Sequence, residues 1–139
     1  MNLINKTTIF IMNFFLKYKF IFYSLNIILI FIYLFPGSIL GLLLNNNISK
    51  HPQITPDFII STNHLYSFFI LSFVGFLTFR KKKQFKILSI YLVFLSIILE
   101  LSHIIIPNRG FEFSDLFGNL LGVIIIICLK YSFKKDENF

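Results

Sequence analysis

Four long apolar runs constrain this chain more than any other feature. They occupy about residues 20–44, 59–79, 87–106 and 114–131 of the 139. A helix needs roughly 20 residues to cross the ~30 Å hydrocarbon core of a bilayer. The runs lack the apolar–polar alternation of a membrane strand, and an open sheet would leave backbone groups unpaired in lipid. The sequence therefore predicts an all-α membrane protein, a bundle of four transmembrane helices.

The composition excludes an ordinary soluble domain. Hydrophobic residues make up 56% of the chain and charged residues only 14%. A soluble domain of this length has too much surface for its volume to hide so much apolar area. Four spans and their short connections use up the chain, so we expect one integral membrane domain over residues 1–139. Within the first run, Pro36 and Gly37 predict a kink or an early exit from the membrane.

The basic residues predict the orientation of the spans. The chain has 13 Lys and Arg residues and a net charge of +7. If it crosses four times, all of these residues except Lys50 and Arg109 fall on the same side as the two termini. The positive-inside rule then places both termini in the cytoplasm. We interpret the basic groups as orientation signals and contacts for anionic lipids, and we expect no nucleic-acid partner.

Polar side chains gather where the third and fourth runs meet. Glu100 and His103 are three residues apart and share one helix face. Asp115 and Asn119 are four residues apart and do the same on the next run, with glycines beside them for close helix approach. Because the runs are antiparallel and the connection is short, these groups should meet at the outer end of the bundle. The expected site has six side chains: His64, Glu100, His103, Arg109, Asp115 and Asn119.

Placing an ionisable side chain within the bilayer costs free energy, so each of these residues is a candidate functional residue. Glu100, His103 and Asp115 are the candidate catalytic residues, since carboxyl and imidazole groups exchange protons as general acids and bases. The candidate ligand-binding residues are His64, Arg109 and Asn119, with the guanidinium holding an anionic group.

A metal site is a further alternative. Glu100-x-x-His103 has the spacing of metal ligands, with His64 or Asp115 as a third. The pattern is short, so the sequence assigns no metal and leaves any cofactor unknown.

The alternative from another class is a non-catalytic scaffold or assembly partner. In that interpretation His103 or Arg109 only holds Glu100, and Asp115 only caps a helix. An ion or proton pathway is disfavoured, because the inner halves of the spans offer no chain of ionisable groups.

One spaced series of residues, within about residues 60–130, resembles the VanZ-like family of bacterial integral membrane proteins. Its members are His64, Glu100-x-x-His103, Pro107-x-Arg109 and Asp115-x-x-x-Asn119-x-x-Gly122. The chain departs from the family pattern at two positions. It has His103 where the family usually has Gln, and Phe68 where the family usually has an aromatic hydroxyl.

The resemblance implies a multi-pass protein of the bacterial cytoplasmic membrane with a role in the cell envelope. The family is linked with resistance to the glycopeptide teicoplanin. The implied function is to bind, with or without modifying, an anionic lipid or a lipid-linked cell-wall intermediate at the outer leaflet. The expected partners are those lipids, and a second copy or another membrane protein is an open alternative. The resemblance assigns no reaction, so whether the protein is an enzyme stays open.

Overall fold

The computed structural model describes the backbone of residues 3–135 and the side chains of residues 18–132. These residues form five helices and no strand, which confirms the all-α prediction for this part of the chain. The helices are α1 (Leu3–Leu34), α2 (Ile39–Asn45), α3 (Thr62–Thr78), α4 (Lys82–Ser102) and α5 (Phe113–Lys135).

Two of these helices are long and apolar enough to cross a membrane. They are α4, over Lys82–Ser102, and α5, over Phe113–Ser132. A third span exists if Tyr18–Leu34 and Ile39–Asn45, which meet at 79°, together form one. Helix α3 has 17 residues and a length of about 26 Å. The architecture is thus compatible with a helical membrane protein of two or three evident spans.

The first apolar run does not continue as one helix to residue 44. Helix α1 ends at Leu34, just before Pro36, which has no N–H to continue the backbone ladder. Gly37 then adopts φ +87°, and a Cβ at this position would lie 2.7 Å from the carbonyl oxygen of Ile48. Ser38 begins the short α2, where its Oγ accepts a hydrogen bond of 3.0 Å from Gly41 N. The chain therefore leaves the bundle early, as Pro36 and Gly37 predict.

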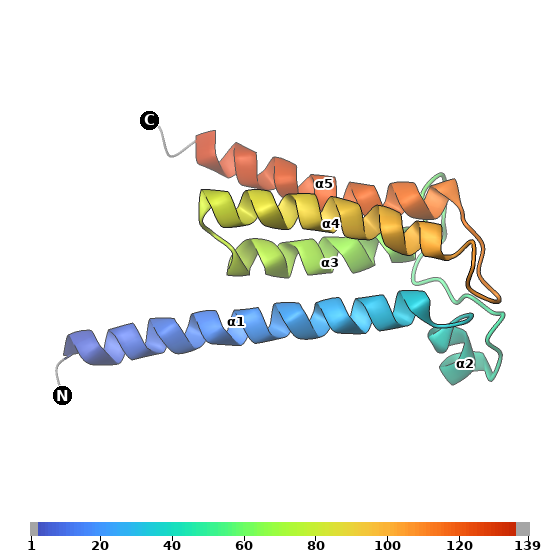
Figure 1. Ribbon diagram of the computed structural model, residues 1–139, viewed down its shortest axis with the longest axis horizontal. Helices are drawn as coiled ribbons and strands as arrows, with labels where there is room; N and C mark the ends of the chain where they lie inside the picture. The colour runs from blue at the N-terminus through green and yellow to red at the C-terminus, as the bar shows by residue number, and fades with distance from the viewer. Residues whose placement is uncertain (1–2, 136–139) are drawn as a thin grey trace.

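Helices α3, α4 and α5 run alongside one another, and α1 extends along the same direction (Figure 1). The start of α1, the α3–α4 connection and the end of α5 lie at one end, and α2 and the longer connections lie at the other (Figure 1). The α3–α5 pair has the most extensive contact. Gly122 makes this possible, since a Cβ there would lie 2.6 Å from Leu65 O and 2.7 Å from Phe69 N.

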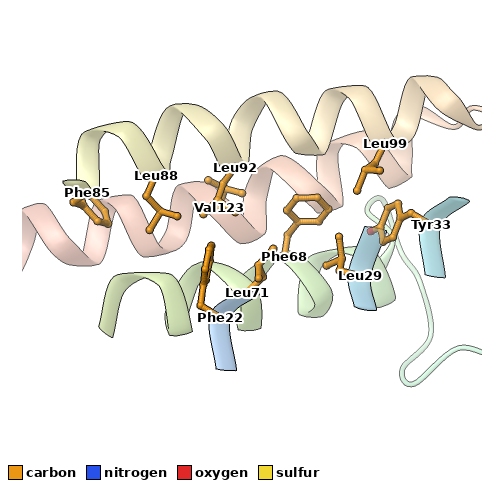
Figure 2. Close-up of a cluster of buried hydrophobic side chains, with 10 residues drawn as sticks. All are labelled: Phe22, Leu29, Tyr33, Phe68, Leu71, Phe85, Leu88, Leu92, Leu99 and Val123. Carbon is orange, nitrogen blue, oxygen red and sulfur yellow. The ribbon is translucent and has the colours of Figure 1, made fainter. Parts of the chain in front are cut away.

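An apolar core fills the space between these helices and leads to the polar end. Its buried side chains, drawn in Figure 2, are Phe22, Leu29, Tyr33, Phe68, Leu71, Phe85, Leu88, Leu92, Leu99 and Val123. Other large apolar side chains point outward; Phe31 and Phe94 are both more than 60% exposed. An apolar exterior of this kind suits contact with lipid.

Candidate functional site

A cavity of about 330 Å³ lies at the end of the bundle that holds α2. Four of the six expected side chains line it: His64, His103, Arg109 and Asp115. The other two, Glu100 and Asn119, are fully buried next to it. All six residues therefore lie in one region, although only four of them face the cavity.

The carboxylate of Glu100 is the centre of the buried polar network. Its Oε1 accepts a hydrogen bond of 3.2 Å from the backbone N–H of Glu112 and lies 3.3 Å from His103 Nδ1. Its Oε2 lies 3.5 Å from Asn119 Nδ2, which donates to it. The last turn of α4 thus holds this side chain against both the α4–α5 connection and α5. Such contacts offset the cost of burying a carboxyl group.

His103 and Glu100 share one proton. His103 Nε2 lies 3.2 Å from the carbonyl oxygen of Tyr33, which can only accept a hydrogen bond, so Nε2 carries a hydrogen. The contact between His103 Nδ1 and Glu100 Oε1 then requires one more proton, on either the imidazole or the carboxyl group. A pair of this kind can pass a proton, but its members are only 1% and 0% exposed. Their place in the structure fits a role in orienting other groups.

Tyr33 is a member of the cluster that sequence reasoning missed. Its hydroxyl donates a hydrogen bond of 2.6 Å to Asn119 Oδ1 and lies 3.1 Å from His64 Nδ1. Its ring stacks on that of His103 and meets Phe68 edge-on, with ring centroids 5.7 and 5.8 Å apart. Tyr33 thus adds a phenolic hydroxyl to the polar cluster. The available signal was a phenolic hydroxyl within the first run, three residues before Pro36.

His64 connects this network to Asp115. Its Nδ1 lies 3.2 Å from Asn119 Oδ1, and its Nε2 lies 3.3 Å from Asp115 Oδ2. Close packing of α3 on α5 sets these distances, because a Cβ on Gly118 would lie 3.2 Å from the Cβ of His64. The glycines beside Asp115 and Asn119 therefore position the polar stripe against α3.

Arg109 contacts the end of α1, and no ion pair between it and Asp115 is found among the described side chains. Its Nη2 donates to Ile32 O at 3.1 Å and its Nε donates to Phe35 O at 3.4 Å. Carbonyls at a helix C-terminus lack partners within the helix and attract cations. Burial lowers the pKa of Arg109, but a guanidinium remains charged in proteins. Arg109 therefore fixes the α4–α5 connection to α1.

The cavity wall carries more acidic than basic groups. Asp57, Glu112 and Asp115 line it together with the single guanidinium of Arg109. His51 also lines it, and partial burial, followed by the charge of Arg109, lowers the pKa of this imidazole and favours its neutral form. An anion entering the cavity would therefore meet Arg109 but also several carboxylates.

Comparison with known proteins gives no matching family model, no similar characterised protein and no matching solved structure. What this chain does must therefore be argued from its own residues and geometry.

Proposed function

We propose that this chain is a VanZ-like protein of the bacterial cytoplasmic membrane, with four spans and both termini in the cytoplasm. Its outer cavity binds the phosphate-bearing headgroup of an anionic lipid or a lipid-linked cell-wall intermediate. The four spans are α1, α3, α4 and α5, so α2 and the cavity lie at the outer leaflet. The VanZ-like resemblance does not name a binding site, and the cavity is the site proposed here.

The position of the cavity is the observation that carries the proposal. Arg80 and Lys81 to Lys83 lie at the α3–α4 connection, and Lys130 lies towards the end of α5, both away from the end with α2 (Figure 1). The positive-inside rule makes the basic end cytoplasmic and the cavity end external. A polar cavity at the end of an otherwise apolar bundle is well placed for a lipid headgroup while the tail stays against the apolar exterior.

Arg109 provides the anion contact. Because two of its nitrogen atoms donate to the carbonyl oxygens of Ile32, in the last turn of α1, and of Phe35, just after it, the guanidinium is held in place at the cavity wall. A preorganised guanidinium is a strong partner for phosphate oxygens. If the protein also modifies its ligand, His64 and Asp115 are the proton-transfer groups that face the cavity, while Glu100 and His103 orient them.

The second candidate is a non-catalytic scaffold, and a specific observation favours it. The contacts of Arg109, Glu100 and Tyr33 join α1, α3, α4 and α5 at one point. A cluster that ties four helices together would be retained for stability alone, without any ligand.

Thermal unfolding of the purified full chain in detergent tests the two candidates. With an added polyprenyl phosphate or phosphatidylglycerol, the melting temperature of wild type should be about 3–5 °C higher than with an added uncharged lipid. Arg109→Lys should lose most of this rise, since a lysine cannot offer the same rigid pair of donors. Lys83→Gln, at the opposite end, is the control: it removes one charge that attracts anionic lipids generally but no contact in the cavity, so it should keep most of the rise.

Two outcomes would reject lipid binding. One is a wild-type melting temperature that ignores both lipids. The other is equal loss of the rise in Arg109→Lys and Lys83→Gln, which would indicate general charge attraction. A lower melting temperature of Arg109→Lys without any lipid effect in wild type would support the scaffold instead.

A further inference from the structure

We propose that His64, Glu100 and Asp115 bind one divalent transition-metal cation, such as Zn²⁺ or Mn²⁺, at the base of the outer cavity. Each of the three residues offers one ligand atom, and these atoms lie within 4.8 Å of one another. They come from α3, α4 and α5, so the site forms only when the three helices pack together. This metal site does not depend on lipid binding, because its ligands are the chain's own side chains.

The direction of the hydrogen bonds leaves a lone pair of His64 facing a carboxylate. Asn119 Nδ2 donates to Glu100, which fixes Asn119 Oδ1 as the acceptor for the Tyr33 hydroxyl. Because the hydroxyl hydrogen of Tyr33 is directed at Asn119, the Tyr33 oxygen can only accept a hydrogen bond from His64 Nδ1. Asn119 Oδ1 is a carbonyl oxygen, so it too can only accept a hydrogen bond from that nitrogen.

His64 Nδ1 therefore carries a hydrogen, and its Nε2 is the free nitrogen of the neutral ring. That Nε2 lies 3.3 Å from Asp115 Oδ2. Two acceptors at this distance repel each other unless a cation or a proton lies between them.

The ligand atoms suit a transition metal. Imidazole nitrogen and carboxylate oxygen bind Zn²⁺ at about 2.0–2.2 Å, which places neighbouring ligands of a tetrahedral shell roughly 3.4 Å apart. The distance of 3.3 Å from His64 Nε2 to Asp115 Oδ2 is close to this value, and all three ligand atoms lie within 4.8 Å of one another. The side chains of His64 and Asp115 are 14% and 19% exposed, so they can adjust around the ion. With three protein ligands, the remaining position would face the cavity.

Charge balance points the same way. With the shared proton of the Glu100–His103 pair on His103, Glu100 and Asp115 are both carboxylates, and together they match the charge of a divalent cation in a region of low dielectric constant. The arrangement around the ligands also resembles that of metal sites. His64 Nδ1 bonds to Asn119, while the second oxygen of Glu100 bonds to the backbone N–H of Glu112 and contacts His103. Such outer contacts orient the metal ligands. The cation would also give a phosphate headgroup a positive partner among the carboxylates of the cavity.

Cobalt titration of the full chain in detergent, after removal of metals with a chelator, tests the proposal. Co²⁺ is a spectroscopic substitute for Zn²⁺, so wild type should bind one equivalent with visible absorption bands and a dissociation constant well below about 1 mM. Zn²⁺ should displace it. His64→Gln and Asp115→Asn should weaken binding at least tenfold. His51→Gln and Glu112→Gln are matched controls that change residues of the same cavity, and both should bind like wild type.

If the variants do not fold, metal binding by wild type alone tests the proposed site. Failure of wild type to bind Co²⁺ or Zn²⁺ up to about 1 mM would overturn the proposal and leave a shared proton between His64 and Asp115. Equal loss of binding in the control variants would overturn it as well. Metal binding without any effect of lipid would reject the proposed function while the metal site stands.

Discussion

The hydroxyl of Tyr33 donates a hydrogen bond of 2.6 Å to Oδ1 of Asn119, which joins α1 to α5 across 86 positions of sequence. The same tyrosine belongs to the apolar core, with 5% of its surface exposed (Figure 2). Its ring therefore packs with the core while its hydroxyl takes part in the polar cluster. Tyr33 is the point at which the packing of the bundle and the geometry of the candidate site depend on each other.

Tyr33→Phe should destabilise the protein by about 1–3 kcal/mol, because Asn119 and His64 lose a partner in a buried place. The apolar volume is almost unchanged, so the effect isolates the hydroxyl. Thermal or denaturant unfolding in detergent measures it. Tyr131→Phe is the control: Tyr131 is 63% exposed, and its loss of a hydroxyl should change stability by less than about 0.5 kcal/mol. Equal effects of the two substitutions would contradict a structural role of the Tyr33 hydroxyl.

The sequence predicts the helical class and the neighbourhood of the polar residues because both follow from local patterns. Apolar runs and helical spacing place Glu100 with His103 and Asp115 with Asn119, and the structure brings all four together. The role of Tyr33 cannot be predicted in this way, because its ring counts as apolar and the direction of its hydroxyl is set by tertiary packing. The partners of Arg109 cannot be predicted either, since they are backbone carbonyls, which every residue has.

Gly122→Ala should lower the melting temperature by several degrees, because the added Cβ would lie 2.6 Å from Leu65 O and 2.7 Å from Phe69 N. These are backbone atoms of α3, so relief requires the two helices to move apart. Gly110→Ala is a matched control, since a Cβ there meets nothing within 4 Å. The two variants should be compared by thermal unfolding and by the yield of folded protein. If Gly122→Ala melts like Gly110→Ala, the contact of α3 with α5 is looser than these distances indicate.

His51 should titrate below its ordinary pKa of 6.5, because partial burial and then the charge of Arg109 disfavour the imidazolium form. The unfolded chain then binds a proton at a higher pH than the folded chain. Stability is unaffected by His51 above about pH 6.5 and decreases as the pH falls below that value. An NMR titration of the His51 ring, assigned with His51→Gln, gives the midpoint directly.

Arg109→Gln removes the positive charge and should raise the His51 midpoint, whereas Lys83→Gln, at the other end of the bundle, should leave it unchanged. A wild-type midpoint at or above 6.5 would contradict the placement of His51 beside the cavity and Arg109.

The proposed orientation predicts which residues a membrane-impermeant thiol reagent can reach in intact cells. Ser49 precedes α3 in the connection at the cavity end, and Lys83 lies in the first turn of α4 at the other end; both side chains are exposed. In a chain with Cys128→Ser, the single cysteine of Ser49→Cys should be labelled in intact cells. That of Lys83→Cys should be labelled only after the membrane is made permeable. The reverse pattern would place the cavity and its carboxylates in the cytoplasm, and the outer-leaflet ligand would then have to be abandoned. Labelling of both positions in intact cells would show that the chain does not separate the two ends across a membrane.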